Sequence, residues 1–252
     1  MEEPEIALTG GRVTAGVVRI GDTVRRPISR DRTLQHDLLS HLEAKGFVGT
    51  PRLLGVDEMN REVLSFIAGE VPADLGHFTD EQLHQAARLL RRFHDATVDL
   101  PAVVAAGAEV MCHNDWGPPN CVLIDGMPCG IIDFDTLAPG PRLWDLGYSA
   151  FSWLDIGNDD EYSGKEQIRR LGVFLDGYGM ASLSVSELAV FVVARQSALS
   201  TWAHMQGKPE MAEWAAACRE WTVREVLEPI LPTAFPEARM TSRAAGFVSG
   251  KE

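Results

Sequence analysis

The sequence lacks the features that mark membrane and exported proteins. None of its apolar runs approaches the about 20 residues that a membrane-spanning helix needs. Its first residues, MEEPEIALTGG, contain neither a basic stretch nor an apolar stretch and so do not resemble a signal peptide. These absences predict a cytoplasmic protein with no membrane partner.

Cysteine and positive charge are both scarce. The four cysteines form no Cys-x-x-Cys pair, which argues against a zinc site and favours buried free thiols. Asp and Glu number 36 against 23 Lys and Arg, a net charge of −13 that disfavours binding to nucleic acid and suits cationic partners. With 45% hydrophobic residues, the chain of 252 residues has enough apolar side chains for a substantial core.

The first part of the chain is expected to be β-rich with one helix. Short strands are predicted in EIALTGG, in AGVVRIGDTVRRPI around a Gly21-Asp22 hairpin turn, and in PRLLGVDEMNREVLSFIAG. Leucines at helical spacing predict a helix over residues 33–47. The junction with the next part is expected between Ser65 and Pro72.

The remainder is expected to be mainly helical. Thr79 precedes an amphipathic stretch as a helix N-cap, and further helices are predicted near 164–179, 184–206 and 209–230. The predicted fold is therefore α+β, with a small β-rich N-terminal lobe at residues 1–68 and a larger helical C-terminal lobe at residues 69–252.

The stretch CHNDWGPPNCVLIDGMPCGIIDFDTLAPG, residues 112–140, concentrates the polar groups that could carry chemistry. Its two apolar runs predict an antiparallel hairpin across a four-residue loop, Asp125 to Pro128. Ile124 would then face Cys129, and Asn120 would lie opposite Asp133.

Asp115 lies just before this hairpin, within reach of the same point. An amide oxygen and carboxylates at one place suit Mg²⁺, which takes one or two carboxylates together with substrate phosphates. Asp115 could accept a proton from, or orient, a hydroxyl.

The spacing His113-x-Asp115-x4-Asn120, followed by Asp133-Phe134, matches a kinase signature. With HNDWGPPN, IIDFD and PRLWDLG in this order, the chain resembles the aminoglycoside phosphotransferase family, relatives of choline kinases and of protein kinases. The resemblance covers most of the chain in order. It implies a two-lobed protein-kinase-like fold that uses ATP and Mg²⁺.

The resemblance also implies roles for individual residues. Asp115 would be the catalytic aspartate, and Asn120 and Asp133 would hold Mg²⁺. Backbone groups near Ser65 and Ile67 would bind the adenine, and the turn Gly10-Gly11 would cover the phosphates. His113 and Asp145 would brace the catalytic loop. The implied reaction is transfer of the γ-phosphate of ATP to a hydroxyl of a small molecule.

The sequence departs from the kinase pattern in three places. It has no lysine before Lys45, so Arg25 or Arg26 takes the position of the strand lysine, and Arg26, at the strand end before Pro27, is preferred. No glutamate stands near Gln35 and His36, where its partner is expected. Asp135 replaces a glycine, either as a further metal ligand or as a loop carboxylate.

Other interpretations remain beside the enzyme. The missing lysine would also fit a nucleotide-binding protein without catalysis, although Asp115, Asn120 and Asp133 are all present. IIDFDTL resembles the start of haloacid dehalogenase phosphatases, but its threonine stands one place early. Among acceptors, aminoglycosides and choline-like amines suit the negative charge, while sugars and amino alcohols stay open.

Overall fold

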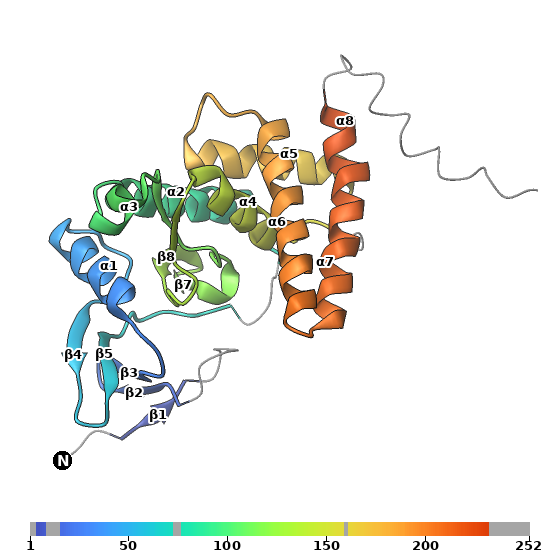
Figure 1. The fold of residues 1–252 in the computed structure, drawn as a ribbon. Coiled ribbons are helices and arrows are strands. Elements are labelled where there is room, and N and C mark those ends of the chain that lie inside the picture. The colour runs from blue at the N-terminus through green and yellow to red at the C-terminus, as the bar shows by residue number, and fades with distance from the viewer. Residues whose placement is uncertain (1–3, 9–15, 73–76, 159–160, 232–252) are drawn as a thin grey trace, which may run out of the picture.

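The computed structural model describes residues 4–8, 16–72, 77–158 and 161–231. Its N-terminal part is a five-stranded antiparallel sheet in the order β1-β2-β3-β5-β4, and helix α1 lies beside β4 (Figure 1). These elements are β1 (Ile6–Ala7), β2 (Val18–Ile20), β3 (Thr23–Pro27), α1 (Thr33–Ala44), β4 (Leu53–Val56) and β5 (Arg61–Ser65). Ile20 pairs with Thr23, which confirms the predicted hairpin turn.

The second part is mainly helical and carries two short two-stranded sheets (Figure 1). Its helices are α2 (Asp80–Thr97), α3 (Pro101–Ala106), α4 (Arg142–Leu154), α5 (Gly164–Tyr178), α6 (Val185–Met205), α7 (Pro209–Thr222), the π-turn η2 (Val223–Leu227) and α8 (Glu228–Ile230). The sheets pair β6 (Val110–Cys112) with β9 (Ala138–Gly140), and β7 (Cys121–Ile124) with β8 (Met127–Ile131), the latter pair preceded by the 3-10 turn η1 (Pro118–Asn120). The predicted α+β architecture is confirmed.

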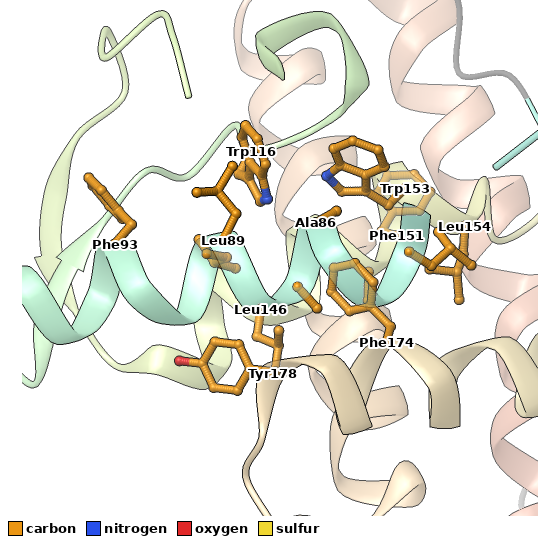
Figure 2. Packing of buried hydrophobic residues seen from close by; sticks show 14 of the residues in the cluster. Ala86, Leu89, Phe93, Trp116, Leu146, Phe151, Trp153, Leu154, Phe174 and Tyr178 are labelled. Carbon is orange, nitrogen blue, oxygen red and sulfur yellow. The ribbon is translucent and has the colours of Figure 1, made fainter. Parts of the chain in front are cut away.

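Helix α2 forms the centre of the C-terminal core. Thr79 caps its N-terminus in a capping box with Gln82, as the sequence predicts. Figure 2 shows the α2 side chains Ala86, Leu89 and Phe93 directed into a cluster of buried residues from the surrounding elements. Three leucines of this helix and Phe93 are completely or almost completely buried, so each stabilises the fold by about 1.5–3 kcal/mol relative to an exposed position.

The described helices include none that is both long and apolar enough to cross a membrane. The four cysteines are unpaired, and Cys112, Cys121 and Cys218 are buried as expected. Cys129 differs, because it is only half-buried on β8.

The hairpin β7–β8 corrects the predicted register. The turn contains only Asp125 and Gly126, both at positive φ, and Ile124 pairs with Met127 rather than facing Cys129. Asp-Gly at left-handed φ closes a two-residue hairpin without strain, so the longer loop is unnecessary. A β-bulge at Leu123 shifts the register of the β7–β8 pair. The Leu123 N–H donates to the Glu70 C=O (2.7 Å), and the Glu70 N–H donates to the Leu123 C=O (2.9 Å).

The corrected register also changes the partner of Asn120. Its C=O accepts the N–H of Ile132 (3.0 Å), so Asn120 lies opposite Ile132 and not opposite Asp133. Asp133 follows at φ +61°, a left-handed conformation that ends the strand alternation and redirects its side chain. Asp133 therefore follows the residue that pairs with Asn120 and does not pair with Asn120 itself.

Helices α4 and α6 make close contact at Gly147, because a Cβ there would lie 2.8 Å from the Phe191 carbonyl carbon. We expect Gly147→Ala to lower the free energy of unfolding by about 1–3 kcal/mol, since the two backbones must separate. Urea denaturation measures this change.

The matched control is Gly172→Ala on α5, where the nearest atom to a new Cβ is Val185 Cγ2 at 3.9 Å. This change should raise the free energy of unfolding by about 0.5–1 kcal/mol, because alanine costs less conformational entropy than glycine inside a helix. Equal effects of the two substitutions would show that α4 and α6 do not depend on this contact.

Candidate active site

A buried aspartate fastens the loop that follows β6. Asp145 on α4 accepts the backbone N–H groups of His113 and Asn114 on separate oxygens, each at 2.7 Å, and lies 2.9 Å from His94 Nε2 on α2. Burial alone would raise the pKa of Asp145, but its hydrogen bond with His94 and the nearby charges hold the pKa below its ordinary value. The loop is thus held to two helices by one ionised carboxylate.

His113 links the same loop to the segment that carries Asp133. The backbone N–H of Asp115 donates to His113 Nδ1 (3.3 Å), so the ring proton is on Nε2, which donates to the Ile132 C=O (3.0 Å). Thr136 donates its hydroxyl to the His113 C=O (2.6 Å). These contacts support the bracing role that the resemblance implies for His113.

The Asp115 carboxylate is held from both sides. Asn120 Nδ2 donates to Asp115 Oδ2 (2.9 Å) and to its backbone C=O (2.8 Å), while the Tyr148 hydroxyl donates to Oδ1. Burial and the charge of Asp115 raise the pKa of Tyr148, so the phenol stays protonated as a donor. This orientation leaves Asn120 Oδ1 without a donor within the described residues, and Oδ1 is the atom that could ligate a metal.

Asp133 is half-buried beside this pair, and Arg26 Nη2 lies 3.4 Å from its Oδ1. Burial raises the pKa of Asp133, against the opposing effect of the Arg26 charge. In the described part of the chain, no group of three or more His, Cys, Asp and Glu side chains could hold a metal ion alone. Mg²⁺ fits Asn120 and Asp133, because this ion commonly takes one or two protein ligands and completes its shell with phosphate oxygens and water.

Asp135 is surrounded by arginines. Arg26 Nη2 lies 2.5 Å and Arg30 Nη2 2.8 Å from Oδ2, and Arg32 Nη1 donates to Oδ1. Partial burial would raise the pKa of Asp135, but the hydrogen bond from Arg32 and the three positive charges hold it below the usual value. Both carboxylate oxygens are therefore engaged by protein, which favours the loop-carboxylate alternative over the metal ligand.

The two arginines of β3 lie on opposite faces of the strand. Arg26 reaches the aspartates described above, whereas Arg25 donates to Thr23 Oγ1 (2.6 Å) and lies 3.6 Å from Asp57. Because strand side chains alternate, only Arg26 faces the catalytic loop. This placement agrees with the preference for Arg26 at the lysine position.

Two residues near Asp115 were not anticipated. Neither Tyr148 on α4 nor Arg195 on α6 is among the site residues predicted from the sequence. Arg195 donates to the Asn114 C=O (2.8 Å) and Oδ1 (3.2 Å), and its guanidinium lies over the Trp144 and Tyr148 rings at 4.5 and 4.8 Å. Asn114, at φ +65°, is thereby fixed in a left-handed conformation next to Asp115.

Of the nucleotide contacts expected at Ser65, at Ile67 and at the Gly10-Gly11 turn, the structure describes the first two residues. Ser65 ends β5, where its N–H donates to the Arg52 C=O and its hydroxyl accepts the Arg52 N–H. Ile67 follows in the interlobe segment, with its Cδ1 3.4 Å from the position that a Cβ on Gly130 would take. Gly10 and Gly11 lie outside the described residues.

Comparison with known proteins agrees with this geometry. The model of the phosphotransferase enzyme family matches residues 96–183, the segment that contains the catalytic loop and the hairpin. The trifolitoxin immunity protein of Rhizobium leguminosarum bv. trifolii is 33% identical over 261 aligned residues, which cover 90% of this chain and 98% of that protein.

Solved structures show the same fold at low identity. A choline kinase from Streptococcus pneumoniae has a TM-score of 0.59 and 15% identity, covering 89% of this chain and 93% of its own. An aminoglycoside phosphotransferase from Streptomyces rimosus, solved with ADP and streptomycin, has a TM-score of 0.53 and 17% identity, covering 85% and 92%. The chain therefore belongs to the phosphotransferase enzyme family and has a protein-kinase-like fold.

Proposed function

We propose that the protein transfers the γ-phosphate of ATP to a hydroxyl group of a small molecule. The observation that carries this proposal is the Asp115 carboxylate, which is oriented by Asn120 and Tyr148 and lies on a loop anchored beside Asp133. This is the arrangement that phosphoryl transfer needs: a base at the acceptor hydroxyl next to a site for Mg²⁺ and phosphates.

Each residue has a defined task in this proposal. Asp115 accepts a hydrogen bond from the acceptor hydroxyl and takes its proton as the oxygen attacks the γ-phosphorus, while the bond from the γ-phosphorus to the β–γ bridging oxygen breaks and ADP leaves. Asn120 and Asp133 would hold Mg²⁺, which would neutralise charge on the phosphates. Arg26 donates to phosphate oxygens, and an arginine can do so with two parallel hydrogen bonds.

The proposed lobes at residues 1–68 and 69–252 enclose this site. Backbone groups at Ser65 and Ile67 would contact the adenine at the junction between them, and Gly10-Gly11 would lie near the phosphates. With the nucleotide phosphates at Asp133 and the acceptor at Asp115, the acceptor oxygen would lie in line with the γ-phosphate.

The acceptor is proposed to be an antibiotic or a similar toxin. This choice is supported by the 33% identical relative, which is named for immunity to trifolitoxin, and by the aminoglycoside phosphotransferase among the structural neighbours. The net charge of −13 favours cationic members of this class, such as aminoglycosides, by long-range attraction. A choline, amino-alcohol or sugar kinase is the second candidate, supported by the choline kinase neighbour.

A screen of acceptors tests the proposal. Purified protein is incubated with ATP and Mg²⁺ and with single hydroxyl compounds, aminoglycosides first, then choline-like amines and sugars, and ADP formation is followed. The proposal expects ADP release that requires both one of these acceptors and Mg²⁺. ATP binding without acceptor-dependent ADP release for any class would favour a nucleotide-binding protein without catalysis.

Arg26→Ala is expected to weaken Mg–ATP binding or lower kcat by about tenfold or more, because a charge-assisted hydrogen bond to phosphate is lost. Arg25→Ala should change either quantity by less than about twofold, because Arg25 lies on the other face of β3, toward Asp57. Calorimetry with ATP and steady-state kinetics measure the two effects. Equal, negligible effects would remove Arg26 from the phosphate site.

A further inference from the structure

The N-terminal part lacks the lysine–glutamate pair of kinases, yet it contains another buried ion pair. Glu62 on β5 is only 1% exposed, and its Oε1 accepts Arg32 Nε at 3.0 Å and lies 2.7 Å from His36 Nε2. A carboxylate so deeply buried destabilises the fold unless it is paired, so the contact with Arg32 offsets the free-energy cost of burying Glu62. Within the described residues, Glu62 Oε2 has no hydrogen-bond partner.

Arg32 connects this buried carboxylate to the candidate active site. It is itself 8% exposed, and it uses Nε for Glu62 and Nη1 for Asp135 Oδ1. A planar guanidinium can hold two carboxylates in fixed directions, which an ammonium group cannot do. Arg32 therefore fixes the position of Asp135 relative to β5.

Asp135 in turn orients Arg26. Its other oxygen, Oδ2, lies 2.5 Å from Arg26 Nη2, and the same nitrogen lies 3.4 Å from Asp133 Oδ1. Arg26 and Glu62 are also direct cross-strand partners on β3 and β5, so they lie on the same face of the sheet. The contacts form a continuous chain from the buried glutamate to the arginine beside Asp133.

We propose that the chain Glu62–Arg32–Asp135–Arg26 replaces the missing lysine–glutamate pair, with Glu62 and Arg32 as positioning residues that direct Arg26 toward the phosphates of ATP. The inference rests on the proposed function, because it requires that phosphates bind at Arg26. Glu62 from β5 performs from a strand the task that a helix glutamate performs elsewhere. Arg30, which is 51% exposed, forms a further ion pair with Asp135 from the solvent side.

The test compares binding of Mg–ATP and of adenosine by calorimetry in the full chain. Glu62→Gln and Arg32→Gln should each weaken Mg–ATP binding by about tenfold, the effect of losing one charge-assisted hydrogen bond. Adenosine binding should change little, because adenosine lacks phosphates. Arg25→Gln is the control, since Arg25 faces Asp57 on the opposite side of β3.

A double variant separates positioning from general support of the fold. In the Arg26→Gln background, Glu62→Gln should no longer weaken Mg–ATP binding, because it acts through Arg26. A loss of the same factor in both backgrounds, or a parallel loss for adenosine, would overturn the proposal.

Arg32→Lys provides the second variant if Glu62→Gln fails to fold. It keeps the charge but cannot hold both carboxylates, so it should weaken Mg–ATP binding as Arg32→Gln does. Binding equal to that of the unchanged protein would show that charge alone suffices and would overturn the bridging geometry. If the unchanged protein bound no Mg–ATP, the proposed function would fail first.

Discussion

Asp115→Asn is expected to lower kcat for phosphate transfer by about 100-fold to 10,000-fold, the usual contribution of a positioned general base. Asparagine keeps the shape of the side chain and one oxygen, so the contact with Asn120 or with Tyr148 can persist. Mg–ATP binding should remain within about threefold, because in the proposed mechanism Asp115 contacts the acceptor and not the metal. Steady-state kinetics and calorimetry measure the two quantities separately.

Asp125→Asn is the matched control for this variant. Asp125 lies exposed in the turn of the hairpin that follows Asp115, at φ +51°, where asparagine is equally well tolerated. Its kcat should equal that of the unchanged protein. Full turnover in Asp115→Asn would remove Asp115 from the chemistry.

Asp145→Asn is expected to lower the free energy of unfolding by about 3–5 kcal/mol, as for other buried charged networks that lose one partner. The new NH₂ group would face one of the donors that Asp145 now accepts, namely the N–H groups of His113 and Asn114 and His94 Nε2. Urea unfolding at neutral pH measures this loss. Asp176→Asn, at an exposed position that pairs only weakly with His84, should change stability by less than about 0.5 kcal/mol.

The same variant has a predicted dependence on pH. The pKa of Asp145 is lowered in the folded protein, so the stability it contributes is present above its unfolded value of 3.8. That contribution is lost as the pH falls through the folded pKa. The difference in stability between the unchanged protein and Asp145→Asn should therefore shrink below pH 3.8, and a difference that grows there would contradict the assignment.

Helices with a clear apolar stripe were the most predictable part of the fold. In α2, the capping residue Thr79 and the leucine spacing both point to the same element, and the structure confirms it. Helix α4 was not predicted, and eight of its thirteen residues are buried. The burial of α4 results from tertiary packing against α2 and α6, which no local pattern records.

The site was predictable where its residues share one stretch of sequence. Asn120 contacts Asp115 and pairs with Ile132, the residue before Asp133, whereas the predicted strand register was wrong. An Asp-Gly dipeptide is the strongest short signal for a two-residue hairpin, and reading Asp125-Gly126 in this way would have given the observed register.

Residues contributed by distant elements were not predicted. Tyr148 and Arg195 reach the catalytic loop only because α4 and α6 pack against it, and Glu62 reaches Asp135 only through Arg32. Tyr148 follows Asp145 by three residues on one helix, so both face the loop. Recognising α4 would have supplied the signal for this residue.

The most direct test of the central claim follows the phosphate itself. ATP labelled at the γ-phosphate is incubated with Mg²⁺, the protein and an acceptor from the screen, and the products are separated. The account predicts label in a phosphate ester of the acceptor for the unchanged protein and for Asp125→Asn, and almost none for Asp115→Asn. Label found only in inorganic phosphate, or equal ester formation by Asp115→Asn, would contradict it.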